Sequence, residues 1–373
     1  MENWGGGELF LLNLVKGNKD FDFIIASPDG KAYDIFNANQ IRLIKINNLR
    51  KIYSKSGKWC LKNKLQIILK SKTNFIILTR VILKNKPNLI LANGNFAALY
   101  SFLAAKLTKR KMIIVQHLLY DKNSLDARVL AFIGKRAQKL VCVSNAVALR
   151  ISEIVTESEK DKITVIHNGV ELPEREGTIT NGGLINIGFV GSIIRAKGID
   201  MILRAVIPVL RENNNVLMHI FGTKLNDDDS QIYYNQIQSI IKEDEIENKV
   251  ILHGHVESKY DIYNSIDILI NFSSVEESLG YNILEAMSYS KIVVGARAGG
   301  IPELIEDKKS GFLVEHNNIE QLKNTINYCI DNFNSEELFN IRKNAREIVI
   351  KKFSVEHFNK SYRNLFNNIL QEK

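Results

Sequence analysis

The chain has 373 residues, which predicts two domains at roughly 100–200 residues per domain. Its composition, 45% hydrophobic and 24% charged, is typical of a globular protein, and no apolar run reaches the roughly 18 residues of a membrane-spanning helix. The net charge of +9 is uneven: residues 1–150 carry 26 basic and 8 acidic side chains, whereas residues 151–373 carry 24 basic and 33 acidic ones.

Short apolar runs alternate with amphipathic stretches along the whole chain. In the first half we predict strands at Phe21–Ala26, Leu89–Ala92, Met112–Gln116, Leu140–Ser144 and Ile163–His167. Amphipathic patterns between them include Leu65–Leu83 and Ala127–Ala137. In the second half we predict strands at Ile185–Val190, Val216–Phe221, Val250–Gly254, Ile268–Phe272 and Ile292–Ala296.

Strand–helix alternation of this length predicts an α/β fold with parallel sheets built from right-handed βαβ units. After the strand at 185–190, a helix with a 3.6-residue period is expected, and its apolar face comprises Ile199, Ile202, Leu203, Val206 and Leu210. The stretch Glu171–Gly183 contains Pro and several Gly and interrupts the pattern. It predicts a hinge between two α/β domains.

A glycine-rich turn, GFVGSIIRAKG at 188–198, leads from a predicted strand into a predicted helix. Such a turn offers backbone N–H groups and the positive end of a helix dipole to a phosphate, and Lys197 adds a cation. The segment contains neither the dinucleotide fingerprint nor a Walker A loop, which disfavours an NAD-dependent oxidoreductase or a P-loop ATPase. A packing turn with solvated Lys197 and Arg195 is the alternative interpretation.

Two glutamates, Glu277 and Glu285, flank the predicted start of a helix that follows the strand at 268–272 and opens at 278–281. The backbone N–H groups near 280–282 are suited to a diphosphate. Ionised carboxylates only accept hydrogen bonds, and each can accept two hydroxyl donors of the kind that sugars present. The alternative is that both glutamates compensate the helix dipole.

Other candidate motifs are less specific. The loop GGIPE at 299–303 permits close backbone approach and places a proline well for a helix start, as an ordinary turn also would. The run Asp227–Asp229 is expected to cap a helix rather than to bind a metal. Three widely spaced cysteines, Cys60, Cys142 and Cys329, predict neither disulfides nor a zinc site and favour a reducing, cytoplasmic setting. The first residues do not resemble a signal peptide.

Together these motifs resemble glycosyltransferase family 4, the retaining, metal-independent enzymes of the GT-B fold. The matching pieces of the second half are GSIIRAKG, the E-x7-E element ESLGYNILEAM, GGIPELI and SGFLV, in the family's order and spacing. The first half agrees more loosely, through GGGE at 5–8, KPNLIL at 86–91, VQH at 115–117, VCVS at 141–144 and VIHNG at 165–169.

The resemblance implies two Rossmann-like domains with parallel sheets facing across a cleft. Residues 1–180 would bind the acceptor, residues 184–350 would bind the donor, and residues 351–373 would form a helix crossing back to the first domain. The reaction would move a hexose-type sugar from a UDP- or GDP-sugar to a glycan or lipid-linked acceptor in surface polysaccharide biosynthesis. The resemblance implies no metal and no cofactor.

The family's residue roles can be carried over position by position. Glu277 would bind the donor sugar, Glu285 the ribose hydroxyls and Lys197 the diphosphate, while His117 would lie near the reacting carbon. A lone histidine after a strand can also be purely structural. The implied catalytic residues are His117, Glu277 and Lys197. The implied donor-binding residues are Gly6, Ser192, Arg195, Lys197, Glu277, Gly280, Tyr281, Asn282 and Glu285.

The sequence departs from the family pattern at two points. The family has Arg after the glycine of its phosphate loop, and this chain has Ser192 there, which removes a cation unless Arg195 substitutes for it. The family also begins with an apolar strand before its glycine loop, but only four residues precede Gly5 here. A missing central strand would expose ladder groups. A GT-B nucleotide-sugar epimerase and a catalytically weakened binding protein are therefore kept as alternatives.

Residues 51–120 contain 14 Lys and Arg residues and no acidic residue. A field of one sign attracts anionic partners, and we expect an anionic membrane surface, with the protein peripheral on the inner membrane face. The alternative is an ordinary lysine-rich surface. Nucleic-acid binding is not expected, because no recognition motif accompanies the charge.

Overall fold

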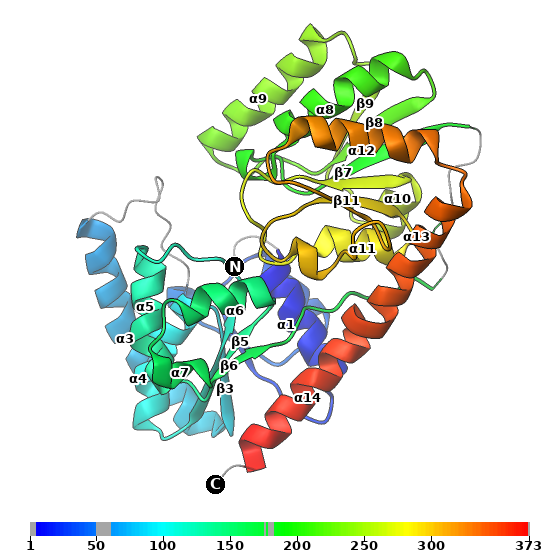
Figure 1. Ribbon diagram of the computed structural model, residues 1–373. Helices are drawn as coiled ribbons and strands as arrows, with labels where there is room; N and C mark the ends of the chain where they lie inside the picture. Colours follow the sequence, from blue (N-terminus) through cyan, green and yellow to red (C-terminus); the bar gives the residue numbers. More distant parts are fainter. Residues whose placement is uncertain (1–4, 50–60, 175–176, 178–182, 372–373) are drawn as a thin grey trace. The chain divides into compact units, whose positions relative to one another are not determined.

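The computed structural model describes residues 5–49, 61–174, 177 and 183–371, and within 61–68 it describes only the backbone. The chain divides into two compact units, shown in Figure 1. Unit 1 comprises Met1–Gly169 and Val355–Lys373, and unit 2 comprises Val170–Ser354. Cys60 and most of the predicted hinge at 171–183 lie outside the described residues.

Unit 2 is built on one parallel sheet with the strand order β12-β11-β10-β7-β8-β9. Its strands are β7 (Ile185–Val190), β8 (Val216–Phe221), β9 (Val250–Gly254), β10 (Ile268–Asn271), β11 (Ile292–Ala296) and β12 (Phe312–Val314). The predicted bounds of β7, β8, β9 and β11 are confirmed. The inner strands β10 and β11 are buried throughout, as expected for a parallel sheet covered on both faces.

Helices cover both faces of this sheet, with α8 packing against α12 and α11 against α13 (Figure 1). The helices are α8 (Ile199–Glu212), α9 (Asp228–Glu243), α10 (Lys259–Asn264), α11 (Tyr281–Ser288), α12 (Ile319–Asp331) and α13 (Glu336–Ile348). Short helical turns are η3 (Arg195–Lys197), η4 (Ile301–Glu303) and the π-helical η5 (Val349–Phe353). The apolar face predicted for α8 is confirmed, because all five of its members are fully buried.

Unit 1 contains parallel strands in two sheets, which no ladder joins within the described residues. One sheet pairs β1 (Ile25–Ser27) with β2 (Leu43–Lys45). The other has the order β3 (Leu89–Asn93), β4 (Lys111–Gln116), β5 (Lys139–Cys142) and β6 (Ile163–Val165). In the described part of the chain the first element is a helix, α1, so no strand precedes the glycine loop there.

The predicted strand Phe21–Ala26 is wrong over most of its length, since only its end belongs to β1. Phe21 and Phe23 instead place their rings 5.3 and 6.2 Å from the ring of Phe366, which belongs to the last helix. Phe21 and Phe23 therefore pack against an aromatic side chain of the last helix instead of pairing in a strand, although their composition favours a strand.

The last helix, α14 (Val355–Gln371), belongs to the core of unit 1 and packs along α1 (Gly6–Gly17) (Figure 1). Phe10 packs against both Phe358 and Tyr362, at ring-centroid distances of 5.4 and 5.5 Å. The remaining helices of unit 1 are α2 (Lys31–Ala38), α3 (Leu61–Asn85), α4 (Asn95–Leu107), α5 (Leu125–Ile133), α6 (Asn145–Ser152) and α7 (Glu157–Lys160), with short turns η1 (Asn47–Leu49) and η2 (Gly134–Arg136).

Candidate functional site

Three loops of unit 2 leave the carboxyl ends of neighbouring strands. The turn at 191–198 follows β7, the segment 272–280 follows β10, and the turn at 297–300 follows β11. The chain continues from β7 to β8 on one side, whereas β10 lies on the other side of β7. A crevice opens where the strand order of an α/β sheet reverses in this way, and ligands of such sheets bind there.

Lys197 and Glu277 meet at this switch point. The Lys197 Nζ lies 2.9 Å from Oε1 of Glu277, and the Ser273 hydroxyl donates to the same carboxylate oxygen. The side chain of Glu277 is only 13% exposed. Burial alone would raise the pKa of Glu277, but the charge of Lys197 and hydrogen bonds from Ser273, Lys197 and Asn271 hold it below the ordinary value. Glu277 is therefore a largely buried carboxylate that stays ionised at neutral pH.

Backbone contacts tie the three loops together. The N–H of Gly300 donates to the carbonyl of Glu277 over 2.8 Å, and the N–H of Ser274 donates to the carbonyl of Ala196 over 3.0 Å. Gly299 has φ +57°, and a Cβ there would lie 2.1 Å from the Glu277 carbonyl oxygen. Gly198 has φ +64°, and its Cβ would lie 2.4 Å from the Phe272 carbonyl oxygen. Both positions therefore require glycine, which fixes the loops around Glu277.

Glu285 has two partners from α10, which no sequence motif had indicated. Lys259 Nζ lies 2.7 Å from Oε1 of Glu285, and the Tyr263 hydroxyl donates to Oε2 over 2.7 Å. Tyr263 is fully buried, and burial, followed by the charge of Glu285, raises its pKa well above the ordinary value. The phenol therefore remains a donor, which fixes the orientation of the Glu285 carboxylate.

The start of α11 is organised by a pair of asparagines. Asn282 donates from Nδ2 to the Val190 carbonyl over 2.9 Å, and its Oδ1 accepts from Asn271 over 2.9 Å. These bonds join α11 to the ends of β7 and β10. Gly280 is the N-cap of α11 and has no side chain to cap it, so the N–H groups of the first turn, at Tyr281 and Asn282, point from an uncapped helix end.

The remaining predicted residues of unit 2 lie in the first loop. Ser192 is half-buried, and its carbonyl accepts the N–H of Ile194. The guanidinium of Arg195 lies 5.2 Å from the ring centre of Tyr233, a cation–π contact, while its carbonyl accepts from the Ser274 hydroxyl over 2.9 Å. The structure thus places Arg195 against α9. That Arg195 replaces the family's phosphate-binding arginine, absent at Ser192, stays a prediction.

Gly6 and His117 belong to unit 1. Gly6 is the first residue of α1, and His117 directly follows β4. The ring of His117 hydrogen-bonds Asn93 Oδ1 through Nε2 and lies 5.0 Å from the ring of Phe10. Asn93 in turn donates to the carbonyl of Gly7 over 3.0 Å. The first turn of α1, the end of β3 and His117 therefore form one connected group in unit 1.

The candidate metal residues have structural roles. Asp227 is the N-cap of α9 and accepts from the Ser230 N–H over 2.8 Å, while Asp228 and Asp229 lie in the first turn. In the described part of the chain, no three His, Cys, Asp or Glu side chains are grouped as metal ligands.

No helix among the described residues has both the length and the apolar character to cross a membrane.

Comparison with known proteins decides the family. Residues 173–348 match the profile described as glycosyl transferases group 1, and residues 4–174 match the one described as glycosyltransferase family 4. The chain belongs to glycosyltransferase family 4. The family resemblance predicted from the sequence is confirmed, and the protein is a glycosyltransferase.

Two relatives and a solved structure match this family 4 chain over nearly its full length. An uncharacterized glycosyltransferase of Methanocaldococcus jannaschii is 26% identical over 370 residues, which cover 94% of this chain and 91% of that protein. The capsular polysaccharide biosynthesis glycosyltransferase CapM of Staphylococcus aureus is 24% identical over 378 residues, with 95% and 92% covered. The crystal structure of Anabaena HepE with UDP and glucose has a TM-score of 0.80 at 21% identity, with 98% and 97% covered. The predicted GT-B fold is thereby confirmed.

Proposed function

We propose that this glycosyltransferase binds a nucleotide sugar in unit 2 and transfers a hexose-type sugar, with retention, to a glycan or lipid-linked acceptor. The observation that carries the proposal is the Lys197–Glu277 pair beside the uncapped start of α11, at the switch point of the sheet. A lysine and unpaired helix N–H groups suit a diphosphate, whereas a buried carboxylate suits sugar hydroxyls. HepE was solved with UDP and glucose, which supports a UDP-sugar.

The proposed chemistry depends on charge rather than on a covalent intermediate with the protein. The bond between the anomeric carbon and the diphosphate breaks, the acceptor oxygen bonds to that carbon, and the acceptor proton passes to the departing diphosphate. Negative charge develops on the diphosphate in this step, so Lys197 and the N–H groups at Tyr281 and Asn282 stabilise it. Glu277 orients the sugar, and Glu285, whose carboxylate is positioned by Tyr263, accepts hydrogen bonds from the ribose hydroxyls.

Unit 1 is the proposed acceptor domain. Its connected group of Gly7, Asn93 and His117 lies at the carboxyl ends of β3 and β4, where α/β units place binding residues. The capsular polysaccharide relative supports a role in surface polysaccharide biosynthesis. The excess of basic residues in unit 1 supports a peripheral position on the inner membrane face, with the protein in the cytoplasm.

The donor assignment can be tested by thermal shift with UDP, GDP and their hexose derivatives. A ligand at 100 times its Kd stabilises the protein by about 2.7 kcal/mol. We expect Glu277→Ala to lose the additional shift that a UDP-hexose gives over UDP while retaining the shift with UDP. Lys197→Ala should weaken both shifts and lower kcat by about a hundredfold or more, because it removes the positive charge that stabilises the departing diphosphate.

Glu276→Gln is the matched control, since Glu276 is the exposed neighbour of Glu277. It should behave as the wild type in both assays. The absence of any shift with every nucleotide and nucleotide sugar would overturn the donor site. Isomerisation of the donor without sugar transfer would instead favour the epimerase alternative.

A further inference from the structure

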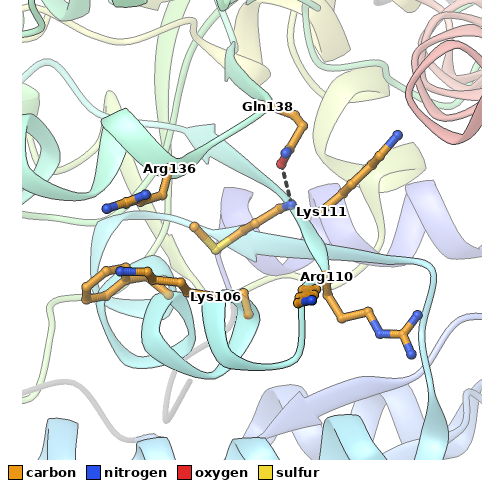
Figure 2. Close-up of a pocket in the computed structure, with 9 residues that line it drawn as sticks. Lys106, Arg110, Lys111, Arg136 and Gln138 are labelled. Atoms are coloured by element: carbon orange, nitrogen blue, oxygen red, sulfur yellow. Dashed lines mark hydrogen bonds between the residues drawn. The ribbon is translucent and has the colours of Figure 1, made fainter. Parts of the chain in front are cut away.

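A cavity lined by basic residues lies in unit 1, at the amino ends of β4 and β5 (Figure 2). It is a cavity of about 270 Å³, whose lining includes the cationic residues Lys106, Lys109, Arg110, Lys111 and Arg136, with Phe102, Met112 and Gln138 among the others. His117 follows the opposite end of β4, roughly 17 Å away at 3.3 Å per residue. The cavity is therefore separate from the proposed acceptor residues.

Most of these cations have no carboxylate partner in the part of the chain that the structure describes. Among the described residues, no carboxylate forms an ion pair with Lys106, Lys109, Arg110 or Arg136, and Arg110 Nε is buried without a hydrogen-bond acceptor. Lys111 differs, because its Nζ donates to the Ile369 carbonyl over 2.7 Å. Figure 2 shows Lys106 and Arg136 extending in the same direction on one side of the cavity, with Arg110 and Lys111 on the other.

Compensation of a helix dipole does not account for this concentration of charge. The cavity adjoins the carboxyl end of α4, where the dipole is equivalent to only about half a negative charge. One cation would balance that end. Four cations without carboxylate partners repel one another, and an anion in the cavity would relieve that repulsion.

The backbone also turns cations toward the site. Lys109 has φ +54°, in the left-handed region, and follows the end of α4 where glycine is the usual residue. The Arg110 N–H donates back to the Ala105 carbonyl over 2.9 Å and closes the turn. A lysine at this position makes the turn less stable than a glycine would. The turn therefore does not account for Lys109, whereas an anion-binding site would use its charge.

Exposed apolar side chains flank the cavity. Leu103 and Leu107, one helical turn apart on α4, are 44% and 63% exposed, and Lys106 lies on the adjoining helix surface. Phe132 of α5 is 59% exposed, and its ring lies 5.2 Å from that of the lining residue Phe102. A basic cavity beside exposed leucines and a phenylalanine fits a membrane surface better than a free ion, because apolar side chains gain from entering the lipid.

We propose that this cavity binds the phosphate of an anionic membrane lipid, with Leu103, Leu107 and Phe132 entering the lipid surface. The cavity has a volume of about 270 Å³, just below the roughly 300–1,000 Å³ of sites for larger organic ligands, so it has ample room for a phosphate group. The inference rests on the membrane placement proposed above and gives it a specific site. It does not involve any residue of the donor site.

Vesicle sedimentation of the full-length protein tests the proposal. We expect binding to vesicles of phosphatidylglycerol and phosphatidylcholine in equal amounts, and little binding to phosphatidylcholine alone. The double variant Lys106→Gln, Arg136→Gln should bind the anionic vesicles about thirtyfold more weakly, at about 1 kcal/mol for each cation near the surface. The matched control is Lys72→Gln, Lys84→Gln, which removes two exposed cations of the same basic segment outside the cavity and should retain binding.

Further measurements distinguish lipid binding at the cavity from a purely structural role of its cations. Lys109→Gly should weaken vesicle binding about fivefold while leaving the melting temperature unchanged or higher, whereas a purely structural role would lower it. The thermal shift with UDP should persist in every variant, so loss of vesicle binding is distinguishable from failure of the donor site.

Three outcomes would overturn the proposal. The first is equal weakening by the control pair, which would indicate a diffuse charge effect. The second is equal binding of the wild type to neutral vesicles or no binding to either. The third is release from anionic vesicles by inorganic phosphate at the concentration of lipid phosphate, which would assign the cavity to a free anion. Phe132→Ala should also weaken vesicle binding, and an unchanged affinity would contradict the apolar contribution.

Discussion

Glu277 combines burial with a negative charge, and groups from two loops make the combination possible. Lys197 comes from the loop after β7, and Ser273 from the same loop as Glu277. Removal of one partner would leave a largely buried carboxylate undercompensated, which destabilises the folded protein. The family resemblance placed Lys197 and Glu277 in one donor site but did not predict their ion pair. Ser273 was missed because a lone serine after a strand has no distinctive pattern.

His219 is a second buried titratable group, and it makes the stability of unit 2 sensitive to pH. Its Nε2 pairs with Asn186 Oδ1 over 3.0 Å, and its Nδ1 pairs with Nε2 of His253 over 2.9 Å. Since Asn186 Oδ1 only accepts, Nε2 of His219 carries the proton and Nδ1 accepts from His253. Burial, followed by the neighbouring His253, lowers the pKa of His219 to about 4.

We expect the free energy of unfolding to decrease as the pH falls from 6.5 to 4. In that window the unfolded histidine binds a proton and the folded one does not, so the contribution is present above pH 6.5 and lost toward pH 4. The loss is about 3 kcal/mol at most. Urea unfolding at several pH values should show a flatter dependence in His219→Gln, which keeps a donor for Asn186 and cannot titrate.

His255→Gln provides the control, because His255 is exposed in the same unit. Its pH dependence should match that of the wild type. A His219→Gln protein whose stability falls as steeply as the wild type's would show that His219 does not carry this effect.

At the scale of elements, the sequence predicted long apolar strands well and short ones poorly. β7, β8, β9 and β11 have the predicted bounds, because each is a mostly apolar segment of five or six residues between turns. β2 and β12 have three residues each, too few to show a period. Lys259 and Tyr263, the partners of Glu285, were missed because they lie on a separate helix, and only the folded sheet brings α10 beside α11.

The last helix gives a prediction at this scale. Phe358 of α14 is 2% exposed and contacts the rings of Phe10 and Tyr362. Phe358→Ala should therefore destabilise unit 1 by about 3–5 kcal/mol, the usual cost of such a cavity. Calorimetry or urea unfolding would measure the change.

Phe339→Ala is the matched control for this substitution. Phe339 lies on α13 of unit 2 and is 58% exposed, so its loss should change stability by no more than about 0.5 kcal/mol. An equally small effect of Phe358→Ala would contradict the assignment of α14 to the core of unit 1.

For the whole molecule, the division into two units has consequences for charge and stability. The basic excess lies in the sequence of unit 1 and the acidic excess in that of unit 2, a contrast that was readable from composition. Each unit also has its own core, with α8 and β7–β12 contributing to one and α1, α14 and β3–β5 to the other. The sequence predicted two domains. It did not predict that the described strands of unit 1 form two sheets with no ladder between them, because strand pairing depends on the folded arrangement.

Separate cores predict separable unfolding. Leu203 is fully buried in α8, so Leu203→Ala should cost about 2–5 kcal/mol in unit 2. In calorimetry, Leu203→Ala should lower a transition that Phe358→Ala leaves in place, and the reverse should hold for the other transition. The double variant should show both shifts with additive magnitudes, since the two sites share no partners. A single transition that each substitution lowers equally would mean that the two units unfold as one, and the pH dependence of His219 would then be a property of the entire chain.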